Sequence, residues 1–509
     1  MARQSVWRGA FWLSLGSLTS RGLGAIYRIF LPRVLGDYGV GLFQMAYPLY
    51  AVLLAVSVNG IPTALAKEIA ERRAREEETE AWALTAWALT GLAAIGGLLA
   101  IAVGWSAPWL ARTLFREPEA VGPIRALAPA LAFVALEAGL RGSFQGQATM
   151  APTAISQIVE QVVRVAVMFP LAIWLLPRGV AAAASGATLG ASVGALAGFL
   201  YLARRRLRES GARLRLRRPI PWQGLRRLAG VAAPMSLSGL FFPLTMLADS
   251  MLVPGRLRQL GFSLTEATAS FGRLSGEAMP LINLTLIVGA ALAVSLVPAV
   301  AQSTFEGRQV EAAERVANAL RLVWVVGLPM AGGLYCLADP LTATLYGETG
   351  AAPVLRVLSL GAAILAAQQV LGSSLQAAGK GWAPVKNLLF GAAAKYALTW
   401  WLTGNLALGI SGAAWGTVLA AALVTYLNWR DWSRVVAHAR SQRPWDHLWI
   451  PLAATAVMGM ALAFLHRLVG DWPDALWLAL ALPAGTVTYA VALLAAGEGQ
   501  VVWRLLKQR

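Results

Sequence analysis

Apolar runs of about 20 residues recur along the whole chain, and short polar segments separate them. About 20 helical residues cross about 30 Å of hydrocarbon, so each run predicts a transmembrane helix. About fourteen spans are expected. They lie at 9–32, 41–65, 82–104, 123–142, 152–176, 180–203, 229–254, 277–302, 317–338, 354–377, 384–404, 409–429, 446–466 and 474–495. The pattern therefore predicts an all-α, polytopic membrane protein.

Composition agrees with this prediction and narrows the chemistry. The 509 residues are 57% hydrophobic and only 13% charged, with a mean hydropathy of +0.60, which no ordinary soluble domain shows. A single cysteine, Cys336, excludes an internal disulfide. The loops are short and hold no Asp, Glu or His cluster with metal-ligand spacing, so we expect no enzyme, metal site or cofactor.

The basic residues predict the orientation. Threading the spans from an inside N-terminus puts roughly 26 Lys and Arg on that side and roughly ten on the other. This bias is typical of a bacterial cytoplasmic (inner) membrane protein with both termini in the cytoplasm. The densest block, 204–227, reads as a topology determinant that touches anionic lipid headgroups. A basic loop at a membrane face already has a partner, so no nucleic acid is expected.

Two short echoes in the sequence indicate an internal repeat. The segment Gly142–Gly146 resembles Gly372–Gln376, and the glycine pair Gly179 and Gly186 resembles Gly409 and Gly416, both at an offset of about 230 residues. The predicted domains are an N-terminal six-helix bundle (1–203), a basic cytoplasmic linker (204–228), a second six-helix bundle (229–430) and two additional helices (431–509). Such pseudo-symmetric bundles commonly rock about a central cavity, which predicts alternating access.

Arginines inside the first span predict what that cavity binds. Arg21 and Arg28 lie in an otherwise apolar stretch, where one arginine costs about 2.5–3.5 kcal/mol to insert. They are two helical turns apart and share a face, so they are expected to line a polar cavity. Guanidinium groups bind phosphate oxygens bidentately, which favours an anionic, phosphate-bearing ligand.

Further charges fall inside the other predicted spans. Glu160 and Arg164, like Glu137 and Arg141, are four residues apart on one helix, so each pair either neutralises itself or contacts the substrate.

Asp249 and Lys395 lie on two different spans. They predict an interhelical ion pair or part of the coupling machinery. Gly60 and Pro62 interrupt the second span, either as a packing kink or as a hinge.

Several motifs together carry a family resemblance. They are Ser20–Gly24, Gly41–Pro48, Gly60–Ala64, Arg141–Gly146, Ile155–Gln161, Asp249–Pro254, Pro280–Leu284 and Gly412–Ala414. With them the chain resembles the polysaccharide-transporter branch of the multidrug/oligosaccharidyl-lipid/polysaccharide (MOP) flippase superfamily, near its sporulation-protein members and more distantly the MurJ-type lipid II flippases. The resemblance covers nearly the whole chain.

The resemblance implies a MATE/MurJ-like fold of fourteen helices in which arginines of the first helix line the central cavity. Arg21 matches the first of these positions, and Arg28 is one position off the second. MurJ-type proteins also carry arginines late in the second helix, where this chain has Ala55–Asn59. In related flippases an acidic residue of the seventh helix contributes to a sodium site. Here Lys395 would bring a positive charge to the region of Asp249, so protonation of Asp249 or Glu160 is an alternative coupling step.

The function expected from the sequence is that of a flippase for an undecaprenyl-diphosphate-linked saccharide, either lipid II or a related cell-wall or polysaccharide intermediate. The substrate-binding residues expected are Arg21, Arg28, Arg164, Glu160 and Arg141. Coupling to Na⁺, H⁺ or the membrane potential is expected, with membrane lipids as surroundings and a monomer as the working unit. The alternative is a cation-coupled multidrug exporter of the same superfamily, although arginines in the cavity would repel its cationic substrates.

Overall fold

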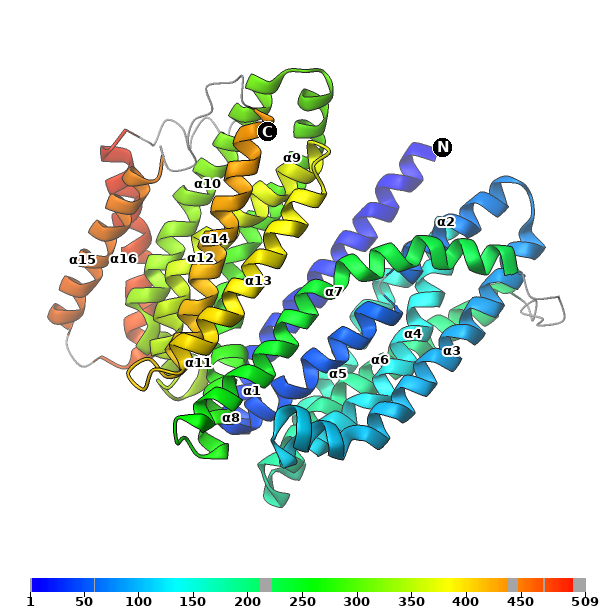
Figure 1. The fold of residues 1–509 in the computed structure, drawn as a ribbon, viewed down its shortest axis with the longest axis horizontal. Coiled ribbons are helices and arrows are strands. Elements are labelled where there is room, and N and C mark those ends of the chain that lie inside the picture. The colour runs from blue at the N-terminus through cyan, green and yellow to red at the C-terminus, as the bar shows by residue number, and fades with distance from the viewer. Residues whose placement is uncertain (1, 59, 211–221, 437–446, 470–471, 498–509) are drawn as a thin grey trace. The chain divides into compact units, whose positions relative to one another are not determined.

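The computed structural model describes residues 2–58, 60–210, 222–436, 447–469 and 472–497, and these contain helices but no strand (Figure 1). Their contacts group the chain into two compact units. Unit 1 comprises residues 1–255 with Ser263–Gly272, and unit 2 comprises Arg256–Phe262 with residues 273–509.

Unit 1 holds the helices of the N-terminal half. They are α1 (Ala2–Ser57), α2 (Ile61–Ala74), α3 (Glu78–Trp109), α4 (Val121–Gly146), α5 (Ala151–Leu175), α6 (Val180–Ser210), α7 (Trp222–Gln259, up to Gly255) and the short α8 (Leu264–Gly272). The π-helical turn η1 (Leu110–Phe115) and the 3-10 turn η2 (Pro118–Ala120) connect α3 to α4, and the 3-10 turn η3 (Leu176–Arg178) connects α5 to α6.

Unit 2 begins with the π-helical turn η4 (Arg273–Ala278) and continues to the C-terminal helices. Its helices are α9 (Met279–Phe305), α10 (Gln309–Cys336), the short α11 (Ala338–Tyr346), α12 (Ala352–Ala377), α13 (Trp382–Thr403), α14 (Ile410–Val435), α15 (Trp449–Val469) and α16 (Asp474–Ala495).

The helices confirm the expected polytopic membrane protein. Each of the fourteen spans expected from the apolar runs coincides with helix, and the first two share α1, which bends at Gly36. Gly36 has φ 64° and ψ 173°, a left-handed conformation that glycine adopts without steric cost. By length and composition, eleven stretches of the described chain qualify as membrane spans. Gly22–Ala74 counts as one of them, and α7 and α13 are not among them, so fourteen is an approximate number.

Helix packing follows the same order in both units. In unit 1, α3 packs on α4, and α4 and α5 both pack on α6; in unit 2, α10 packs on α12, and α12 and α13 both pack on α14. This correspondence agrees with the repeat read from the sequence. The contacts group α7 with unit 1, whereas the sequence-based boundary at 229 assigned it to the second bundle, and that boundary stays a prediction.

The interruption predicted at Gly60 separates two helices. Helix α1 ends at Ser57 and α2 begins at Ile61. A Cβ atom on Gly60 would lie 2.2 Å from the carbonyl oxygen of Ala232 in α7, and the Gly60 N–H donates to Ser236 Oγ at 3.3 Å. The break therefore serves close backbone packing within unit 1.

Candidate functional site: a charge network and a cavity in unit 1

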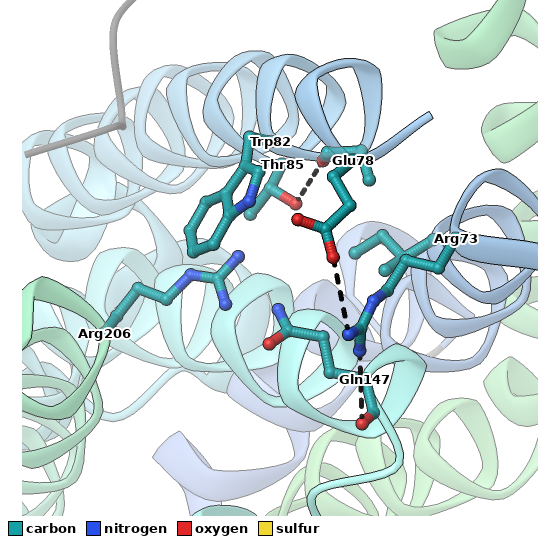
Figure 2. A pocket seen from close by; sticks show the side chains of 8 residues that line it. Arg73, Glu78, Trp82, Thr85, Gln147 and Arg206 are labelled. Atoms are coloured by element: carbon teal, nitrogen blue, oxygen red, sulfur yellow. Dashed lines mark hydrogen bonds and ion pairs between the residues drawn. The ribbon is translucent and has the colours of Figure 1, made fainter. Parts of the chain in front are cut away.

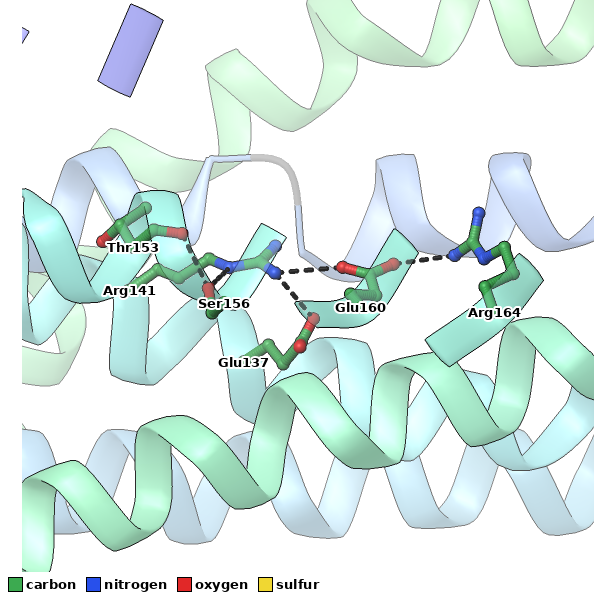
Figure 3. Close-up of polar contacts among 6 residues, drawn as sticks. All are labelled: Glu137, Arg141, Thr153, Ser156, Glu160 and Arg164. Carbon is green, nitrogen blue, oxygen red and sulfur yellow. Dashed lines mark hydrogen bonds and ion pairs between the residues drawn. The ribbon is translucent and has the colours of Figure 1, made fainter. Parts of the chain in front are cut away.

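Four charged side chains of α4 and α5 form one connected network (Figure 3). An Arg141 terminal nitrogen lies 3.1 Å from a Glu137 oxygen and 3.0 Å from Glu160 Oε2. The other Glu160 oxygen accepts a hydrogen bond of 2.7 Å from Arg164. Both pairs predicted along a single helix are therefore present, and Arg141 joins them across two helices.

The network is buried and balanced. Glu137 is fully buried, and Glu160 and Arg164 are 9% and 8% exposed. Two carboxylates face two guanidinium groups, so the formal charges cancel, which offsets much of the cost of removing each ion from water. Ser156 adds a polar contact, because its hydroxyl oxygen accepts from Arg141 Nε at 3.0 Å while its O–H donates to the Thr153 carbonyl at 2.7 Å.

Glycines of α6 allow this network to be packed so closely. Gly186, Gly190, Gly194 and Gly198 follow one another at four-residue intervals and therefore share one face of the helix. A Cβ on Gly194 would lie 2.6 Å from the Glu160 carbonyl oxygen, and one on Gly198 would lie 1.9 Å from Glu137 Oε1. A stripe of small residues is a sequence signal for close helix packing. The residues expected from the sequence to form the site did not include these glycines.

A small cavity lies beside the network, between α1, α4, α5 and α6. Its lining residues are Tyr27, Phe43, Tyr47, Leu127, Arg164, Met168, Thr188 and Ala191. Arg164 thus has one side toward Glu160 and another toward this cavity. The cavity wall is mostly apolar and aromatic. Its longest polar side chains are those of Arg164, Tyr27 and Tyr47.

Arg28 lies at the edge of the cavity. Tyr27, which is buried, contacts both Arg28 and Arg164. The Arg28 guanidinium carbon is 5.7 Å from the centre of the Tyr47 ring. In the described part of the chain no carboxylate forms an ion pair with Arg28, whereas Arg164 pairs with Glu160.

The other predicted site residues lie as follows. The side chain of Arg21 is outside the described residues, although its backbone belongs to α1. Asp249 of α7 belongs to unit 1 and Lys395 of α13 to unit 2, both half-buried, and their predicted ion pair stays a prediction. Within the described ranges no three His, Cys, Asp or Glu side chains gather as metal ligands.

A polytopic helical membrane protein with a charge network and a cavity buried among its helices has the features of a membrane transporter. Residues 6–304 match the polysaccharide biosynthesis protein family. The chain is 30% identical over 441 residues to stage V sporulation protein B of Bacillus subtilis (strain 168), covering 86% of this chain and 85% of the relative. The chain belongs to this family, in the polysaccharide branch of the MOP flippase superfamily.

Other relatives agree with this placement. The lipid II flippase MurJ of Bacillus subtilis (strain 168) is 26% identical over 371 residues, covering 68% of this chain and 67% of the relative. An inward-facing MATE family multidrug resistance transporter has a TM-score of 0.68 at 16% identity, covering 84% of this chain and 95% of that one. An inward closed structure of MurJ has a TM-score of 0.60 at 15% identity, covering 95% and 99%. The two solved structures show that the fold is MATE/MurJ-like.

Proposed function

We propose that this protein is a flippase that moves an undecaprenyl-diphosphate-linked saccharide, such as lipid II or a related precursor, across the cytoplasmic membrane. The observation that carries the proposal is Arg28, a cation within an apolar membrane span that contacts aromatic side chains and, among the described residues, no carboxylate. Such a charge is unfavourable in hydrocarbon until an anion binds it. A diphosphate supplies that anion.

The surrounding residues fit a headgroup of this kind. Tyr27 contacts both Arg164 and Arg28, so a phosphate bound near Tyr27 would lie close to two guanidinium groups. Guanidinium binds phosphate oxygens through paired hydrogen bonds, and these are strongest where water is scarce. The hydroxyls of Tyr27 and Tyr47 can donate to phosphate or sugar oxygens. The lipid tail stays in the bilayer while the headgroup crosses.

In the proposed cycle, two bundles alternate access to the headgroup and the protein works as a monomer with both termini in the cytoplasm. Na⁺, H⁺ or the membrane potential supplies the driving force. The relationship to the lipid II flippase MurJ and the match to the polysaccharide biosynthesis protein family support a lipid-linked saccharide as the substrate.

The test is native mass spectrometry of the detergent-purified protein titrated with undecaprenyl diphosphate, lipid II and a cationic dye. The variants are Arg28→Ala, Arg28→Lys and the control Arg178→Ala. Arg178 is exposed and stacks on Trp174, with 4.8 Å from its guanidinium carbon to the ring centre, so it makes a similar aromatic contact outside the cavity.

We expect Arg28→Ala to weaken diphosphate-lipid binding about 10- to 100-fold, the effect of losing a hydrogen bond to a charged group. Arg28→Lys should lose less because the charge remains, and Arg178→Ala should bind like wild type. The same order is expected for lipid translocation in vesicles. Wild-type binding of diphosphate lipid by Arg28→Ala, or dye binding without diphosphate-lipid binding, would contradict the proposal.

A further inference from the structure

Two glutamates of the charge network share one guanidinium group in a way that the function proposed above does not use (Figure 3). The same terminal nitrogen of Arg141 lies 3.1 Å from Glu137 Oε2 and 3.0 Å from Glu160 Oε2. The two carboxyl groups also lie within hydrogen-bonding reach of each other. Two carboxylates at such a distance repel each other, whereas a carboxyl that holds a proton can donate it to the other. This arrangement therefore favours a pair that binds one proton.

Glu137 and Glu160 differ in what holds them. Glu160 accepts a hydrogen bond of 2.7 Å from Arg164 and one of 3.0 Å from Arg141. Glu137 is fully buried, and within the described chain neither of its oxygens accepts a hydrogen bond, so Arg141 contacts it only as an ion pair. Burying a charged oxygen without hydrogen bonds is costly. Glu137 is therefore better suited to hold the proton, and Glu160 still contacts both arginines when Glu137 is neutral.

The neighbouring helices close the space around Glu137. A Cβ atom on Gly198 of α6 would lie 1.9 Å from Glu137 Oε1, so the backbone of α6 covers this oxygen. Helix α3 meets α4 with leucine side chains, beside Gly139. Further titratable and charged groups near the network come from α1, and they are Tyr27, Arg28, Tyr47 and Tyr50. Within the described ranges, Arg141 and Arg164 are the cations that contact the glutamate pair.

One proton changes the charge next to the cavity. With both glutamates ionised, the four side chains of the network carry no net charge, and with one proton they carry a charge of +1. Arg164 ends the network and also lines the cavity. The added positive charge therefore favours an anion in the cavity. By thermodynamic linkage, an anion bound there favours the proton by the same factor.

We propose that Glu137 and Glu160 together bind one proton, and that this proton and the anionic headgroup of the substrate bind cooperatively. The step that involves the headgroup rests on the function proposed above, whereas proton binding by the pair stands without it. The proton comes from water and returns to water, so no other bond forms or breaks. The side chains of Arg141 and Glu160 are 15% and 12% exposed, which leaves the proton a way to reach the pair. Binding of the headgroup therefore weakens as the pH rises.

The first experiment detects the proton without any ligand. Infrared difference spectra of the purified full-length protein compare pH about 6 with pH about 9, a range in which ordinary carboxylates stay ionised. The variants are Glu137→Gln and Glu160→Gln, with Glu78→Gln as the control. Glu78 lies outside the network, contacts the guanidinium group of Arg73 at 3.7 Å, and has a side chain that is 59% exposed (Figure 2).

We expect wild type and Glu78→Gln to show the same carboxylic-acid C=O band and Glu137→Gln to lose much of it. Glu160→Gln should lose it too, because Glu137 would then face two guanidinium groups without a second carboxylate. This variant keeps the test valid if Glu137→Gln does not fold. Glu117, another buried carboxyl, contributes a part of the band that stays in every variant. A band that neither Glu137→Gln nor Glu160→Gln reduces would overturn the proposal.

The second experiment measures the affinity for lipid II, whose diphosphate keeps its charge over this range of pH. Tryptophan fluorescence titrations are made at pH about 6 and at pH about 9. We expect wild type and Glu78→Gln to bind about tenfold more weakly at the higher pH, and Glu137→Gln, which keeps the charge of the protonated network, to bind equally at both. Equal binding by wild type at both values would overturn the cooperative step. If lipid II binds at neither, the proposed function fails, whereas the infrared band still decides whether the pair holds a proton.

Discussion

Replacing Glu160 with Gln removes the residue that joins the two arginines of the buried network. Glu160 accepts from Arg164 at 2.7 Å and contacts Arg141 at 3.0 Å, and its side chain is 12% exposed. Its loss leaves two guanidinium groups facing one carboxylate, that of Glu137. Breaking a buried ion pair from one side typically costs about 3–5 kcal/mol, because the partner charge stays buried without compensation.

The double variant Glu160→Gln/Arg164→Gln separates this effect from a simple loss of contacts. With both residues neutral, Arg141 and Glu137 remain as a balanced pair at 3.1 Å. We therefore expect the double variant to be more stable than the sum of the single losses predicts, by about 1–3 kcal/mol. Unfolding in mixed SDS and detergent micelles, followed by tryptophan fluorescence, measures these free energies.

The control cycle uses Lys67 and Glu71, an i,i+4 pair of α2 at 3.8 Å with both side chains largely exposed. Its coupling should stay within about 0.5 kcal/mol. If the losses at Glu160 and Arg164 are additive, or if their coupling is no larger than that of the exposed pair, charge balance does not stabilise the network.

Three further single substitutions test contacts within unit 1 and within unit 2. Burial raises the pKa of the Glu117 carboxylate, which accepts a hydrogen bond from Thr268 at 2.7 Å. The unfolding temperature of the wild type should therefore rise relative to that of Glu117→Gln as the pH falls from about 7 towards 5. A difference between the two proteins that does not change with pH would refute this. Gly41→Ala should lose about 1–3 kcal/mol in SDS unfolding, because its Cβ would lie 2.1 Å from the Thr268 carbonyl oxygen, and wild-type stability would contradict that contact. Asn387→Ala removes a buried hydrogen-bond donor that lies 2.9 Å from Asn428. The free energy of unfolding of unit 2 should fall by about 1–2 kcal/mol. An unchanged free energy would show that this hydrogen bond contributes nothing.

The sequence predicted the helices well because the bilayer requires long apolar segments whose length is nearly fixed. The bridge between Arg141 and Glu160 could not be predicted in this way. These residues lie 19 positions apart on different helices, and their contact depends on how closely α4, α5 and α6 approach. The glycines of α6 set that approach. Their four-residue spacing was visible in the sequence, but the partner helix was not.

The same limit applies to the predicted substrate residues. Charges inside apolar spans can be read from a sequence, whereas compensation between them depends on the packing of the spans. Arg141 and Arg164 each have a carboxylate at 3.1 Å or less, and from a distance such pairs are nearly neutral.

Arg28 has aromatic neighbours instead, so it keeps its full charge at the edge of the cavity. An anion bound there offsets more of the insertion cost than an anion bound at an arginine that a carboxylate already neutralises. The proposed transport of a diphosphate should therefore depend more strongly on Arg28 than on Arg141, although both arginines were among the substrate-binding residues expected from the sequence.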